Sequence, residues 1–137
     1  MPSDMPSPKV QFDHEKLDVY QLGLLFVSWT SALFGELRDA KVPLIKEVVD
    51  QLDRASISVV LNIAEGNGRR TGQARAKFFD DARGSGTECA ACLDVMVAKG
   101  ACSVERIAEG KASLFRIVSM LCKHVERFDE AARKEER

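Results

Sequence analysis

Apolar residues recur every three or four positions along four segments of the chain, which is the spacing of a buried stripe on an α-helix. The alternation of apolar and polar residues that marks a β-strand is absent from the sequence. Breaks at Pro43, at Gly66-Asn67-Gly68 and at Gly100 separate the four segments. The pattern therefore predicts an all-α protein.

These breaks set the expected helices at about residues 13–37, 43–65, 71–99 and 104–128. Helices joined by connections this short pack antiparallel to their neighbours. The sequence predicts one domain, an antiparallel, up-down-up-down four-helix bundle over residues 13–130. We expect a disordered amino-terminal tail over residues 1–12 and a charged carboxy-terminal tail over residues 131–137.

Several residues predict how the helices begin, end and pack. Asp13 is expected to cap the first helix, and Pro43 to occupy the first position of the second. The glycines of Gly66-Asn67-Gly68 should end the second helix, because glycine adopts the left-handed conformation of a helix stop. Gly84 and Gly86 lie inside the third helix, where each costs about 1 kcal/mol relative to alanine. Their expected compensation is close approach of another backbone.

The first helix carries two apolar stripes, whereas a helix in a monomeric bundle needs only one. One stripe consists of Leu17, Tyr20, Leu24, Val27 and Phe34. The other includes Val19, Leu22, Phe26, Trp29 and Leu33. Exposed apolar patches of this size are uncommon on monomers, so the second stripe predicts an interface between copies of the chain. The alternative is a helix sunk more deeply between its neighbours.

Polar residues follow one face of the second helix at steps of four, four and three: Arg54, Ser58, Asn62 and Glu65. If the third helix returns antiparallel, its own polar residues face them: Arg83, Ser85 and Glu88. Arg54 can then reach Glu88 or the Ser85 hydroxyl. We interpret the set as a buried polar seam that fixes helix register, with a catalytic site as the alternative. The sequence shows no nucleophile with a base and no other catalytic motif, so we expect no enzymatic activity.

The four cysteines, Cys89, Cys92, Cys102 and Cys122, are expected to be free thiols in a reducing cytoplasm. Cys89 and Cys92 have the spacing of half a zinc site, which Cys122 and His124 could complete. Cys89 and Cys92 both lie inside a helical pattern, whereas cysteine pairs that bind zinc usually lie on tight turns. We therefore interpret them as small core residues and expect neither a metal nor a cofactor.

Charge and hydropathy narrow the possible partners. Lys+Arg 20 against Asp+Glu 21 gives a net charge of −1, which predicts no general affinity for nucleic acid or membranes. No apolar run approaches the roughly 20 residues that cross a bilayer, and residues 1–10 lack the apolar core of a signal peptide. We therefore expect a cytoplasmic protein that does not bind membranes.

The turn between the second and third helices is nevertheless locally basic. It contains or adjoins Arg69, Arg70, Arg75 and Lys77. Basic residues on a loop can hold phosphate groups, so these four are the candidate nucleic-acid-binding residues. The alternative is a solvated helix start without a ligand. Phe78 and Phe79 follow directly, and we expect both to pack in the core rather than stack on bases.

Three sequence motifs resemble those of the four-helix bundle proteins related to those encoded by 23S rRNA intervening sequences. The first helix contributes Leu17-Asp18-Val19-Tyr20. The second contributes Gln51-Leu52-Asp53-Arg54-Ala55-Ser56-Ile57-Ser58 followed by Asn62-Ile63-Ala64-Glu65-Gly66. The third contributes Phe78-Phe79, Ala82-Arg83-Gly84-Ser85 and Glu88. The resemblance covers roughly residues 13–128.

The resemblance implies an antiparallel four-helix bundle that can assemble as a ring-shaped pentamer. The same family includes the accessory variability determinant of diversity-generating retroelements, which binds nucleic acid and a reverse transcriptase through a strongly basic surface. This chain has a net charge of −1 and departs from that feature. We predict a non-enzymatic homo-oligomer that acts as a scaffold for structured RNA or DNA, or for a nucleic-acid-processing partner. The alternatives are an oligomer that binds only proteins and an enzyme that uses the polar seam.

Overall fold

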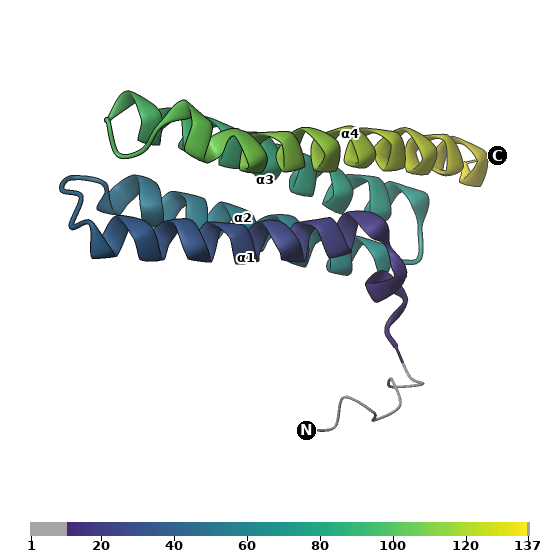
Figure 1. Ribbon diagram of the computed structural model, residues 1–137. Helices are drawn as coiled ribbons and strands as arrows, with labels where there is room; N and C mark the ends of the chain where they lie inside the picture. The colour runs from purple at the N-terminus through teal and green to yellow at the C-terminus, as the bar shows by residue number, and fades with distance from the viewer. Residues whose placement is uncertain (1–10, 137) are drawn as a thin grey trace, which may run out of the picture.

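The computed structural model describes residues 11–136, and its regular structure within this range is entirely helical. A 3₁₀ turn, η1 (Asp13–Lys16), precedes the four helices α1 (Asp18–Asp39), α2 (Lys46–Asn67), α3 (Gly72–Ala98) and α4 (Val104–Glu135). The predicted all-α four-helix bundle is confirmed (Figure 1). Of the tail predicted over residues 1–12, all but the last two residues lie outside the described range.

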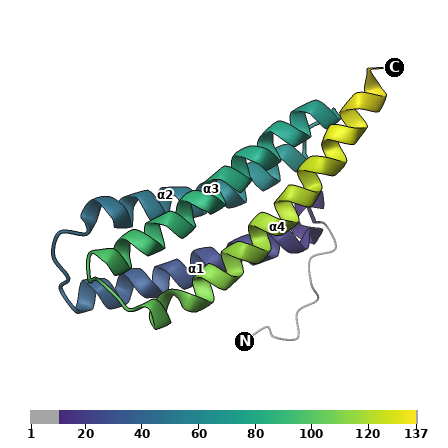
Figure 2. The same ribbon diagram turned by 90° about the horizontal axis from the view of Figure 1, so that it is seen from above.

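Successive helices lie side by side and run in opposite directions (Figures 1 and 2). The Ser58 hydroxyl of α2 lies 2.9 Å from the Ser85 hydroxyl of α3. α1 closes the bundle against α4, where Arg106 donates to Glu36 at 2.6 Å. The α1–α2 and α3–α4 turns lie at one end of the bundle (Figure 1). The α2–α3 turn, the start of η1 and the end of α4 lie at the other, which we call the α2–α3 end.

The core runs along the bundle axis and receives side chains from all four helices. Its fully buried members include Leu33, Leu52, Ile63, Phe79, Leu93, Leu114, Ile117 and Leu121. Burying one large apolar side chain contributes about 1.5–3 kcal/mol relative to leaving it exposed, so these stripes hold the helices together. None of the helices between residues 11 and 136 combines the length and the hydropathy that a membrane span requires.

The stripe predicted as an interface between copies lies within the single chain. Val19, Phe26 and Leu33 are buried in the core, and Leu22 and Trp29 are partly buried against it. A Cβ atom at Gly110 of α4 would overlap the Trp29 ring, so the missing side chain lets α4 approach α1 closely. The alternative of a deeply sunk first helix therefore describes Val19, Phe26 and Leu33, whereas Leu22 and Trp29 keep part of their surface exposed.

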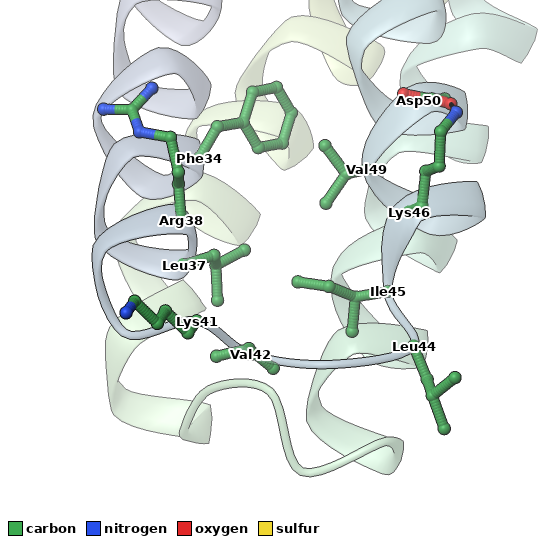
Figure 3. Close-up of a pocket in the computed structure, with 10 residues that line it drawn as sticks. All are labelled: Phe34, Leu37, Arg38, Lys41, Val42, Leu44, Ile45, Lys46, Val49 and Asp50. Atoms are coloured by element: carbon green, nitrogen blue, oxygen red, sulfur yellow. Dashed lines mark hydrogen bonds and ion pairs between the residues drawn. The ribbon is translucent and has the colours of Figure 1, made fainter.

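The second helix begins at Lys46, three residues later than predicted from Pro43. Lys41 and Leu44 both have left-handed backbone conformations, with φ of 55° and 60°, so the chain bends twice before the helix starts. Leu44 is 89% exposed. Leu44 lies at the edge of the hollow between α1 and α2 with its side chain directed away from α1, whereas Ile45 points into that hollow (Figure 3).

The start of the first helix also differs from the prediction. Asp13 begins the separate turn η1, and α1 starts at Asp18 without a side-chain cap. The Asp13 carboxylate instead accepts a hydrogen bond from the Asn67 amide at 2.9 Å, which joins η1 to the end of α2. The amino-terminal end of the bundle is therefore fixed by a contact between residues far apart in sequence.

The glycines have different roles from those expected. Gly68 ends α2 with φ of −83°, so it does not use the left-handed conformation, and a Cβ at Gly66 would collide with Phe79. A Cβ at Gly86 would meet a side chain of α4, whereas nothing lies within 4 Å of one at Gly84. Close approach of another backbone therefore explains neither glycine of α3. Gly100, with φ of 75°, follows α3 as predicted.

The fourth helix continues to Glu135, beyond the predicted end of the bundle at residue 130. Its amino-terminal cap is Ser103, whose hydroxyl accepts from the Arg106 backbone N–H at 3.0 Å. At the far end, the Glu135 carboxylate accepts from the Gly72 backbone N–H at 3.0 Å. An acidic group there complements the positive end of the α3 dipole. Residues 131–135 therefore extend the bundle rather than leave it as a tail.

Candidate nucleic-acid interface

The structure brings the four predicted cations to one end of the bundle. We call them the basic cluster: Arg69, Arg70, Arg75 and Lys77. The α2 helix ends at Asn67, and the Thr71 hydroxyl caps α3 by accepting from the Ala74 N–H at 3.1 Å. This short connection places two arginines in the turn and the other two cations in the first turns of α3.

The turn is ordered by its own arginines. Arg75 Nε donates to the backbone carbonyl oxygen of Arg69 at 2.7 Å, and its guanidinium lies 5.8 Å from the centre of the Phe128 ring. Arg75 therefore ties the turn to α4. Arg69 donates to the Glu65 carboxylate at 2.6 Å. Glu65, predicted as part of the polar seam, thus pairs within the turn rather than with α3.

The cluster retains positive charge for a ligand. Lys77 pairs with Asp81 at 3.2 Å, and the exposed Arg70 has no carboxylate within 4 Å among residues 11–136. Both carboxylate pairs in the cluster involve largely exposed side chains. Such pairs contribute only about 0–1 kcal/mol, so a phosphate group can compete for Arg69 and Lys77.

Phe78 does not lie where it was predicted. Phe79 is fully buried, as expected, but Phe78 is only partly buried. The guanidinium of Arg69 lies 4.7 Å from the centre of the Phe78 ring, and the ammonium of Lys77 lies 5.3 Å from it. The basic cluster therefore contains a partly exposed aromatic ring, which the expectation of core packing missed.

A surface hollow adjoins the cluster on the side of α2 that faces η1. We call it the Phe12 hollow; its lining residues are Phe12, His14, Leu61, Ala64, Glu65, Gly68 and Arg69. Little in the hydrophobic pattern predicts this hollow, because the sequence predicts a tail over residues 1–12. The Asp13–Asn67 contact, which links distant parts of the chain, shows that this segment returns to the bundle.

Part of the predicted polar seam is formed. The Ser58 and Ser85 hydroxyls share a hydrogen bond of 2.9 Å across α2 and α3. The Asn62 amide donates to both the carbonyl and the hydroxyl of Ser58 at 2.9 Å. Among residues 11–136 no buried side-chain nitrogen or oxygen lacks a hydrogen-bond partner, which suits a role of this group in fixing helix register.

The predicted contact between Arg54 and Glu88 is not formed. Gln51, one turn earlier on α2, donates to the Glu88 carboxylate, and exposed Arg54 donates to the Gln51 side-chain oxygen at 3.0 Å. Gln51 lies opposite Glu88, so it reaches the carboxylate first. Arg83 pairs with Asp80 on its own helix at 2.8 Å rather than with a carboxylate of α2. The seam therefore excludes both arginines assigned to it.

The shifted pKa values away from the ion pairs belong to Cys89, Cys92, Cys102 and His124, and burial is the largest cause of each shift. Burial raises the pKa of the Cys89 thiol to about 12, and it also raises that of Cys92. Both thiols are therefore protonated at neutral pH, whereas a nucleophile or metal ligand must be a thiolate. Burial, followed by the nearby Arg127, lowers the pKa of His124, which contacts the Phe79 ring. Within residues 11–136, no group of three or more His, Cys, Asp or Glu side chains is placed to hold a metal ion.

Comparison with models of known protein families gives a match. Residues 15–123 match the family model of the 23S rRNA-intervening sequence protein, over more than half of the chain. The matched range contains the polar seam and the whole basic cluster. A search of the curated proteins finds no match, and neither does a search of the solved structures.

Proposed function

The chain belongs to the 23S rRNA-intervening sequence protein family, and from this membership we propose that it is a non-enzymatic, homo-oligomeric scaffold that binds structured RNA at the α2–α3 end. The observation that supports RNA binding is the basic cluster, which gathers four cations at an ordered turn and the start of α3. Its charge is local, which explains how a chain of net charge −1 can attract a phosphate backbone.

The exposed apolar side chains that remain after folding support assembly. On α1 they include Leu24 and Leu25, and on α2 they include Ile57. A cyclic oligomer would repeat the basic cluster by symmetry, which turns modest charge per chain into a ring of positive potential.

Light scattering on the purified protein should give the mass of several chains, and of five chains if it forms the ring that the resemblance implies. The physical reason is that a second copy covers apolar surface that water contacts in the single chain. A mass of one chain across the accessible concentration range would overturn the assembly proposal. RNA binding by the single chain would remain open to the separate test below.

Replacing Arg69 and Arg70 together with alanine should abolish binding of a structured RNA in a fluorescence anisotropy titration. Binding by the wild type should be indifferent to sequence and should weaken steeply with added salt, because phosphate contacts release counterions. The melting temperature should change little, because the one ion pair removed is exposed.

The matched control removes two cations from the opposite end of the bundle, Arg38→Ala with Lys99→Ala. Both residues are exposed. This control loses two positive charges, as the Arg69 and Arg70 variant does, but it keeps the basic cluster intact. The control should bind RNA like the wild type. If the Arg69 and Arg70 variant binds as well as the control, the basic cluster is not the site. If the wild type binds no RNA even at low salt, an oligomer that binds only proteins becomes the better description.

A further inference from the structure

We infer that the α2–α3 end binds an unpaired ribonucleotide, with its base stacked on Phe12 in the Phe12 hollow and its phosphates held by the basic cluster. The inference rests on the proposed function and names the class of RNA: single-stranded segments, loops or ends rather than continuous duplex. The basis of the inference is a set of aromatic rings that the fold keeps exposed beside cations.

The first observation is the exposure of a large apolar ring. Phe12 is 74% exposed, yet its backbone N–H donates to the Glu15 carboxylate at 2.8 Å. The neighbouring Asp13 is bonded to Asn67 of α2. The segment that carries the ring is therefore fixed on the bundle, and the ring does not fold into the core.

The second observation is that Phe12 belongs to an aromatic stack. Its ring lies 5.7 Å from the His14 ring, at an interplanar angle of 20°. The His14 ring in turn meets the edge of Tyr20, with ring centres 4.7 Å apart. The stack presents an aromatic surface in a nearly fixed orientation. Bases stack on such rings without regard to sequence, because every base has a π-face.

The third observation is the distribution of polar groups around the hollow. Leu61 and Ala64 supply apolar lining for the face of a base, whereas Glu65 and Arg69 supply charge. A carboxylate accepts hydrogen bonds from the amino group of a base, and a guanidinium binds phosphate. The pair that these two residues now form is exposed and can exchange for those contacts.

Arg69 also connects the hollow to a second ring. It lines the Phe12 hollow and lies 4.7 Å from the centre of Phe78. A strand that leaves the hollow past Arg69 therefore reaches another partly exposed aromatic residue, which Lys77 also approaches. Alternation of rings and cations is the arrangement that single-strand-binding proteins use. In duplex RNA the bases are already paired and stacked, so a protruding ring gains nothing from them.

The test uses a single-stranded oligoribonucleotide that carries one 2-aminopurine, and the same strand annealed to its complement. Wild-type protein should bind the single strand more tightly and should quench the 2-aminopurine on binding. Phe12→Leu keeps apolar bulk but removes the ring, so affinity for the single strand should fall by roughly 5- to 100-fold and the quenching should be lost. Its affinity for the duplex should equal that of the wild type.

Phe115→Leu is the matched control, because Phe115 is 76% exposed on α4 and does not line the Phe12 hollow. It should bind and quench like the wild type. Equal affinity of wild type and Phe12→Leu for the single strand would overturn the inference, as would equal wild-type affinity for the two RNAs. If the Arg69 and Arg70 variant still loses all binding in that case, the proposed function stands without the stacking site. If the wild type binds neither RNA, both proposals fail.

Discussion

Trp29→Asp should lower the free energy of unfolding by about 3–5 kcal/mol, because it removes a large ring from the contact between α1 and α4. The Trp29 ring fills the space left by Gly110, stacks on Phe26 with ring centres 5.7 Å apart, and lies 5.2 Å from the Arg106 guanidinium. Arg106 already donates twice to Glu36, at 2.6 and 2.7 Å, so a new aspartate would compete for a satisfied partner.

Urea unfolding followed by far-ultraviolet circular dichroism measures this change, since the single tryptophan is itself replaced. Phe115→Ala serves as the control for loss of an aromatic ring from an exposed site and should change stability by no more than about 0.5 kcal/mol. The sequence alone predicts a different result for Trp29→Asp: separation of intact copies. A variant with wild-type stability and a lower mass in light scattering would contradict this expectation and would place Trp29 at an interface between chains.

The position of each helix could be predicted from the sequence because periodicity is a local signal. The turn at Gly100 depends on neighbouring residues only, and it was predicted. The two stripes of α1 were also visible, but the sequence could not say what covers the second one. That answer depends on Gly110, which lies on a helix far along the chain.

Contacts between distant residues account for the differences. Glu135 extends α4 by capping the first N–H of α3, and Asp13 forms a separate turn by accepting from Asn67. Neither contact leaves a periodic trace in the sequence. Leu44, which has a left-handed backbone, is a difference of another kind. It is an apolar residue after proline, and nothing in the sequence indicates that its side chain will lie in solvent.

The candidate site also has one part that the sequence predicts and another that it does not. The basic cluster is contiguous in sequence, so its residues could be named directly. The Phe12 hollow combines η1 with the end of α2 and could not be found without the fold. In the polar seam the predicted register between α2 and α3 was approximately right. Gln51 lies one helical turn before Arg54, however, and it is Gln51 that contacts Glu88.

Gly66→Ala and Gly84→Ala should have opposite effects on stability although the chemical change is the same. A Cβ at Gly66 would lie 2.7 Å from both Phe78 Cβ and Phe79 Cδ1. Phe79 is fully buried and cannot move aside, and overpacking of this kind costs about 1–3 kcal/mol. A Cβ at Gly84 would meet nothing within 4 Å, so alanine there should stabilise the helix by about 0.5–1 kcal/mol.

Urea unfolding of the two variants beside the wild type measures the contrast, and Gly86→Ala provides an intermediate case. A Cβ at Gly86 would lie 2.9 Å from the Val118 Cγ2 atom, which rotation of one side chain can relieve. Gly66→Ala should therefore unfold at the lowest denaturant concentration and Gly84→Ala at the highest. If Gly84→Ala instead destabilises the protein, the space beside Gly84 must be filled in solution by a group outside the single chain. In that case the exposed face of α3 would be where copies of the bundle meet.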